Sequence, residues 1–201
     1  MWNRIKSLFQ SSARSIHDAL AIDTMEKGCQ SKIRWVAESI YESEEFRRRA
    51  KISADELGPE TIEQLSKMFH AEHSPPKELE EKFSGLGAWI SARQFAIFEM
   101  FYNFGENAIP ALRRVAYGEY DWTQVSAIEV LCRLAADGSQ RDDLVGQLRQ
   151  RFPNIRFEAQ LYAIQPLLKQ SEHNPNIKNI LSELEDLPEY QDVLQELSEP
   201  E

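Results

Sequence analysis

The 201-residue chain has few of the residues that build cross-links, metal clusters and turns. Its two cysteines, Cys29 and Cys132, have no CxxC partner and no histidine at ligand spacing, which excludes a disulfide framework. We expect two buried thiols in a reducing, cytoplasmic environment. The eight glycines and nine prolines lie mostly between periodic segments, as is typical of helices joined by short loops.

Long apolar runs are also missing. No segment approaches the roughly 18 residues that a membrane-spanning helix needs, so we expect no integral membrane segment. Lys6, Ser7 and Gln10 interrupt the apolar residues at the start of the chain, which argues against a secretory signal. The region 2–22 instead has an amphipathic helical pattern.

Catalytic and cofactor motifs are absent too. The sequence has no glycine-rich nucleotide loop, no HExxH and no GxSxG, so we expect neither a catalytic site nor a cofactor. His70 and His73 have a spacing that metal sites use, but further ligands are not evident. We interpret them as a polar helix end before Pro75-Pro76, and expect no metal.

The charge is unevenly distributed. The net charge is -10, and residues 171–201 account for -8 of it, with one lysine and nine acids. Nucleic acid is disfavoured as a partner, because phosphate binding needs clustered Lys and Arg. An acidic tail suits a basic protein partner, or else a solvated helix surface that keeps the protein soluble.

The N-terminal third reads as helices without a repeat. Apolar spacing predicts one helix over 30–50, a capping box at Ser53-Ala54-Asp55-Glu56, and a further helix through Ile62 to Phe69. Pro75-Pro76 is the best internal boundary. We therefore divide the chain into an N-terminal helical segment, 1–75, and a second region, 76–201.

The second region shows a period of about 33 residues. Five apolar positions of a reference unit recur one step later, and four of the five recur one step earlier. The reference positions are Leu112, Val115, Ile128, Leu131 and Leu134. Each unit reads as two helices: in the reference unit the first spans about 107–117, and the second runs from Asp121 to Ala136 before Gly138. The fold predicted is all-α, an α-solenoid of stacked antiparallel helix pairs with an acidic C-terminal cap.

These residues resemble a HEAT-type repeat, best over 107–170. The resemblance lies in an apolar first helix, a turn near an aspartate, and a second helix of small and aliphatic residues: Ile109, Pro110, Ala111, Leu112, Val115, Asp121, Val125, Ala127, Ile128, Leu131 and Gly138. The arginine that the family often carries in the second helix is replaced here by Gln124 or Ser126. The resemblance implies a curved scaffold that binds proteins or, in some branches, nucleic acids or small pigments.

A candidate protein-binding surface lies on the second helices, opposite the predicted core. It comprises Trp122, Glu129 and Arg133, with Trp89 one step earlier and Tyr162 one step later. Aromatic and arginine residues are frequent interface anchors, although large aromatics also pack between helices.

Three functions remain open. The first is a non-enzymatic protein-binding scaffold or adaptor, of which a toxin-neutralising, immunity-type protein is a narrower form. The second is a HEAT-like nucleic-acid repair or lyase-associated protein. The third is a homo-oligomer that buries the surface around Trp122.

Overall fold

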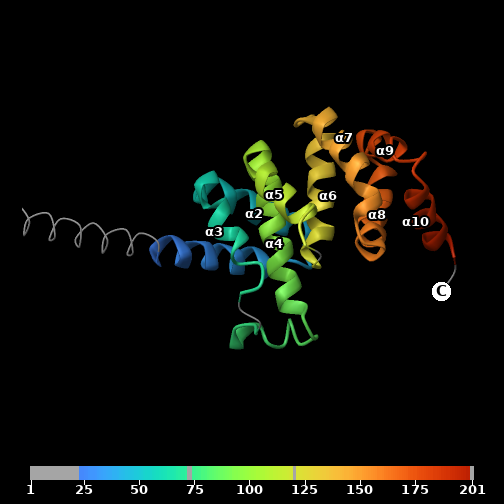
Figure 1. The fold of residues 1–201 in the computed structure, drawn as a ribbon. Coiled ribbons are helices and arrows are strands. Elements are labelled where there is room, and N and C mark those ends of the chain that lie inside the picture. Colours follow the sequence, from blue (N-terminus) through green and yellow to red (C-terminus); the bar gives the residue numbers. More distant parts are fainter. Residues whose placement is uncertain (1–22, 72–73, 120, 200–201) are drawn as a thin grey trace, which may run out of the picture.

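A computed structural model describes residues 23–71, 74–119 and 121–199 (Figure 1). Every regular element in these ranges is a helix, which confirms the all-α class. A helix covers 23–37, and the elements that follow are α2 (Ser43–Leu57), η1 (Pro59–Thr61), α3 (Ile62–Ser66), η2 (Lys77–Leu79), α4 (Ala88–Phe104), η3 (Gly105–Ala108), α5 (Ile109–Ala116), α6 (Thr123–Ala136), α7 (Arg141–Arg151), η4 (Phe152–Asn154), α8 (Phe157–Ser171), α9 (Pro175–Ser182) and α10 (Pro188–Ser198). The amphipathic pattern at 2–22 lies outside the described residues.

The helices pack in chain order. Helix α2 packs on α4, α4 on α6, and α6 on α8, while α5 and α7 contact α6 and α9 contacts both α6 and α8. Figure 1 shows the same succession, with α10 at the far end of the molecule. The two helices predicted for the reference unit, over about 107–117 and 121–136, are present as α5 and α6 with ends that differ by one or two residues, and helix pairs follow them as far as Ser198.

The N-terminal third differs from the prediction. The single helix expected over 30–50 is two helices, because the chain turns at 38–42, where the buried Ser39 hydroxyl donates to the Val36 carbonyl at 2.8 Å. The predicted capping box is also wrong, since Ser53 to Glu56 lie inside α2. Small buried residues there, Ala50, Ser53 and Ala54, let α2 approach α4 closely.

The segment 23–71 packs directly on the region that follows it. The Phe69 ring stacks on Phe98 of α4 with centroids 4.7 Å apart, and the Gln94 amide donates to the Phe69 carbonyl at 3.2 Å. Helix α4 is consequently buried around most of its circumference. The sequence boundary at Pro75-Pro76 thus separates two parts that share one core.

The unit predicted over 76–106 is incomplete. Its first helix is missing, because 77–79 form only one 3-10 turn and 80–87 form turns and loops before α4. Phe95, placed in the core by a gap-free 33-residue step, is 47% exposed. The step is therefore wrong at Phe95, although Phe98 and Phe101, which it also places in the core, are buried.

A different repeat fits the burial. In α4, α6 and α8 a polar residue is followed three and four residues later by Ala-Ile, and seven residues later by Met or Leu. We call this the core motif, and it comprises Arg93, Ala96, Ile97 and Met100; Gln124, Ala127, Ile128 and Leu131; and Gln160, Ala163, Ile164 and Leu167. All twelve side chains are buried. The motif starts at 93, 124 and 160, so its steps are 31 and 36 residues, not a constant 33.

The polar residue of each core motif has the same structural role. Gln124 donates to the Ala116 carbonyl at the end of α5 at 2.8 Å, and Gln160 donates to the Phe152 carbonyl after α7 at 2.6 Å. Arg93 likewise donates to the Ala71 carbonyl. Carbonyls at helix ends and in loops lack intrahelical partners, so each of these buried side chains ties its helix to a segment earlier in the chain.

Candidate functional site

The structure has a groove on the side of α4 and α6 opposite their core motifs. We number positions from the polar residue of the motif, which is position 0. Positions 0, 3, 4 and 7 form one stripe along the helix, which faces the core. Positions 2, 5, 6 and 9 form a second stripe about 200° away around the helix, which we call the groove stripe. In α4 the groove stripe consists of Phe95, Phe98, Glu99 and Tyr102. In α6 it consists of Ser126, Glu129, Val130 and Arg133. Seven of these eight residues line a single groove.

This central groove has a volume of about 850 Å³ and crosses α2, α4, α6 and α8. Its floor is formed by the buried side chains of Phe98 and Val130 together with Ser126. One wall comes from α2 and the turn before it, and the other from the end of α8. The wall residues are Ile40, Ser43, Phe46 and Arg47 on the first side and Lys169, Gln170, His173 and Asn174 on the second.

Arg133 and Glu129, both predicted site residues, lie in this groove. Arg133 donates to both carboxylate oxygens of Glu99 at 2.7 and 3.0 Å, and its guanidinium lies 3.9 Å from the centre of the Tyr102 ring. Glu129 accepts a hydrogen bond from the Gln170 amide at 2.7 Å, which joins α6 to α8.

The Arg133–Glu99 pair is largely shielded from solvent, with 20% and 10% of the two side chains exposed. Burial alone would lower the pKa of Arg133, but the hydrogen bonds and charge of Glu99, together with Glu129 and Tyr102, raise it. The guanidinium is therefore held in place by Glu99 of α4, which takes two of its five N–H donors.

Trp122 and Tyr162 come together at the edge of the groove. Their ring centroids are 5.8 Å apart, and the two residues are 64% and 46% exposed. Trp122 lies one turn before Ser126, so it extends the groove stripe of α6, and Tyr162 occupies the equivalent stripe position of α8. These two predicted residues are thus accessible and adjacent.

Trp89 does not belong to this surface. It is 1% exposed and packs edge-on against Phe83 with centroids 5.0 Å apart. The 33-residue step matched it to Trp122, but the core motif places Trp89 four residues before Arg93, on the buried stripe of α4. A contact between Trp89 and a partner would require the core to open.

Sequence reasoning missed Phe95, Arg47 and Lys169. Phe95 and Tyr162 share one motif position, so an alignment that allowed steps of unequal length would have paired them. Arg47 lies in the N-terminal third, which has no repeat, and only the packing of α2 on α4 brings it to the groove.

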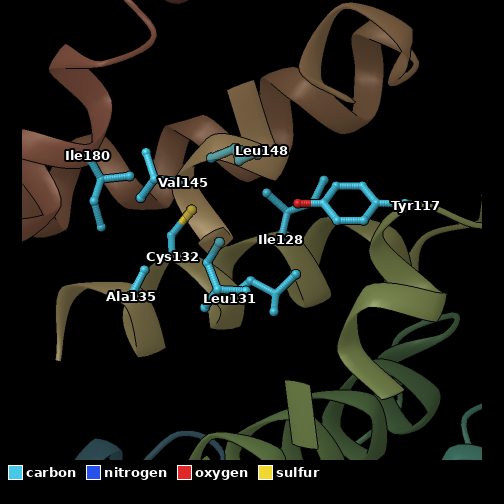
Figure 2. A pocket seen from close by; sticks show the side chains of 9 residues that line it. Tyr117, Ile128, Leu131, Cys132, Ala135, Val145, Leu148 and Ile180 are labelled. Carbon is cyan, nitrogen blue, oxygen red and sulfur yellow. The ribbon is translucent and has the colours of Figure 1, made fainter. Parts of the chain in front are cut away.

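A second, much smaller cavity lies between α6, α7 and α9 (Figure 2). It has a volume of about 10 Å³ and apolar walls that include Ile128, Cys132 and Val145. Such a space is about the size of one water, which is too small for a ligand. Figure 2 shows the Cys132 sulfur pointing from α6 toward Val145, so this cysteine is a packing residue, as the sequence predicted for both thiols.

Both cysteines should resist thiol reagents in the folded protein. Burial raises the pKa of Cys132 to about 12, which leaves roughly one thiol in ten thousand ionised at pH 8. Burial also raises the pKa of Cys29. With Ellman's reagent at pH 8 we expect almost no release of the chromophore from native protein and two equivalents in denaturant; fast labelling of native protein would contradict the packing around α6.

Metal and membrane sites find no support among the described residues. No group of three or more His, Cys, Asp or Glu side chains in 23–71, 74–119 and 121–199 is arranged to hold a metal ion. His70 lies 3.3 Å from the Asp121 carboxylate, as a surface contact; His73 is outside the described residues. None of the described helices combines the length and apolarity that crossing a bilayer requires.

Arg113 and Arg114 of α5 each form an ion pair with an acid of another helix. Arg113 pairs with Asp143 of α7, and Arg114 pairs with Glu63 of α3. Acids of the C-terminal region do the same, since Arg141 pairs with Glu183 at 2.5 Å and Arg149 pairs with Asp186. Part of the acidic tail thus fastens the last helices to α7.

Comparison with protein-family models, with curated proteins and with solved structures gave no significant match for this chain. The functional conclusion therefore depends on the groove itself.

Proposed function

We propose that the chain is a HEAT-like α-solenoid that acts as a non-enzymatic protein-binding scaffold, with the central groove as its binding surface. The strongest support is that the groove stripe continues from α4 through α6 to α8. On this one face lie the exposed aromatic side chains and, next to them, the polar groups around Arg133. An apolar strip with a polar surround is the usual anatomy of a protein interface.

Three of the five exposed aromatics among the described residues lie on this face. Phe95, Trp122 and Tyr162 are each more than two-fifths exposed, although aromatics normally lose most of their surface on folding, while Tyr41 and Phe157 lie outside the groove lining. They have large contact areas and few rotatable bonds, so ordering them costs little entropy on association. A toxin-neutralising role is one special case of this proposal, which the identity of the partner would decide.

The test compares two exposed apolar residues. Leu86 is fully exposed and lies outside the groove, whereas Phe95 lies within it. We expect Phe95→Asp to lose a protein that the wild-type chain captures from extracts of the native cell, because it places a charge in an apolar contact. Leu86→Asp should retain that protein. Helix content by circular dichroism should be the same in all three.

Equal capture by the two variants would contradict the proposal that the groove is the binding surface. If Phe95→Asp instead abolished a self-association seen by light scattering, the partner would be a second copy of the chain. Salt-sensitive binding of an oligonucleotide that Phe95→Asp removed would support the nucleic-acid function in its place.

A further inference from the structure

The central groove has a different charge balance from the rest of the chain. Its lining contains three permanent cations, Arg47, Arg133 and Lys169, against two carboxylates, Glu99 and Glu129. With histidine neutral, the groove therefore carries a net charge of +1 on a chain whose net charge is -10. A cationic groove on an acidic protein needs an explanation that composition does not supply.

Both carboxylates of the groove already have partners. Glu99 receives both hydrogen bonds of the Arg133 guanidinium, and Glu129 accepts from the Gln170 amide. The cations on the walls differ, since among the described residues neither Arg47 nor Lys169 forms an ion pair or side-chain hydrogen bond. The unused charge of the groove is therefore positive.

These two cations lie on opposite sides of the groove. Arg47 is in the first turns of α2, and Lys169 is in the last turn of α8, next to His173. Helices α4 and α6 lie between them in the packing order, and they supply the apolar floor and the exposed Phe95 ring. A cation in a last turn complements the helix dipole, which accounts for Lys169 but not for Arg47.

From this arrangement we infer that the partner of the central groove is an acidic protein segment with an apolar anchor. The anchor packs between Phe95 and the floor, and acidic side chains on its two sides reach Arg47 and Lys169. This inference depends on the proposed function, because it names the chemistry of the partner for the same groove.

The overall charge does not prevent such binding. At physiological ionic strength the screening length is about 8 Å, so contacts with the nearest cations outweigh repulsion from the distant C-terminal acids. Nucleic acid fits less well, because its backbone carries a charge every ~1.7 Å along the helix axis, and the groove offers two unpaired cations beside two carboxylates.

The test uses two labelled amphipathic peptides with the same Leu and Trp residues and a polar side of either Glu or Lys. We expect the wild-type protein to bind the Glu peptide at least tenfold more tightly than the Lys peptide in fluorescence anisotropy. The double variant Arg47→Glu/Lys169→Glu should weaken the Glu peptide about tenfold or more, since two attractions become repulsions.

A matched control changes the same net charge elsewhere. Lys51 of α2 and Lys178 of α9 are exposed and lie outside the groove lining. Lys51→Glu/Lys178→Glu should preserve the preference for the Glu peptide within about twofold. An equal effect of the two double variants, or wild-type preference for the Lys peptide, would overturn the inference.

The two proposals fail in different ways. If both peptides bind equally and Phe95→Asp weakens both, the groove still binds protein and only the acidic chemistry is wrong. If Phe95→Asp changes neither peptide nor the captured protein, the groove is not the binding surface and both proposals fail.

Discussion

Replacing Glu99 with leucine should lower the free energy of unfolding by about 2–3 kcal/mol, because the Arg133 guanidinium is then left largely buried without its counter-ion. Loss of one partner of a fully buried pair costs about 3–5 kcal/mol, and we expect less here because Arg133 keeps 20% of its side chain exposed. Urea unfolding of both proteins, followed by circular dichroism, measures the difference.

A double variant distinguishes the effect of the unpaired guanidinium from that of lost packing around position 99. Glu99→Leu/Arg133→Leu removes both charges, so it should recover most of the stability that Glu99→Leu loses. The exposed Glu63 of α3, which pairs with Arg114, is a control whose replacement by leucine should cost under about 1 kcal/mol. If the double variant were no more stable than Glu99→Leu, the unpaired guanidinium would not be the cause.

Replacing Ile97 with alanine should cost about 3 kcal/mol, whereas replacing Phe95 with alanine should cost under about 1 kcal/mol. Ile97 has no exposed surface and occupies the isoleucine position of the core motif, while Phe95 points into the groove. The larger side chain is thus the cheaper one to truncate.

This pair distinguishes the two repeat alignments. A constant 33-residue step aligns Phe95 with Ile128 and gives Ile97 no core position, so it predicts the opposite order of costs. Chemical unfolding of the two variants under one set of conditions decides between them, and a larger loss for Phe95→Ala would contradict the core motif.

The C-terminal half of the fold was predictable because its boundaries carry local signals. The Asp121 side chain accepts from the Thr123 backbone amide at 2.6 Å, Asn174 caps α9, and Pro188 starts α10. Gly138 has a φ of 95°, which an L-residue adopts only with strain, so it ends α6 reliably. Such signals act within a few residues and need no knowledge of tertiary contacts.

The N-terminal half was not predictable in the same way. Helix α4 is covered on one side by α2 and on another by α6, so its apolar residues occur around most of the helix and show little 3.6-residue periodicity. The register of the repeat failed for a related reason. Loops of unequal length shift the core motif by 31 and then 36 residues, which a constant step cannot follow.

The candidate site was predicted in part. Trp122, Glu129, Arg133 and Tyr162 lie in or beside the groove because α6 had its correct register and Tyr162 falls on the groove stripe of α8. The groove wall formed by α2 was not predicted from the sequence. Arg47 is more than forty residues from α4 in sequence, and only the packing of α2 on α4 brings it to the groove.

Site-specific photo-crosslinking tests the central claim most directly. A benzophenone amino acid is placed at Phe95 in the groove or, in a separate protein, at Leu86 outside it, and both are irradiated in the native cell. The account predicts a discrete adduct with one other protein from position 95, joined through an acidic segment, and none from position 86. Adducts of the same protein from both positions, or from position 86 alone, would contradict it.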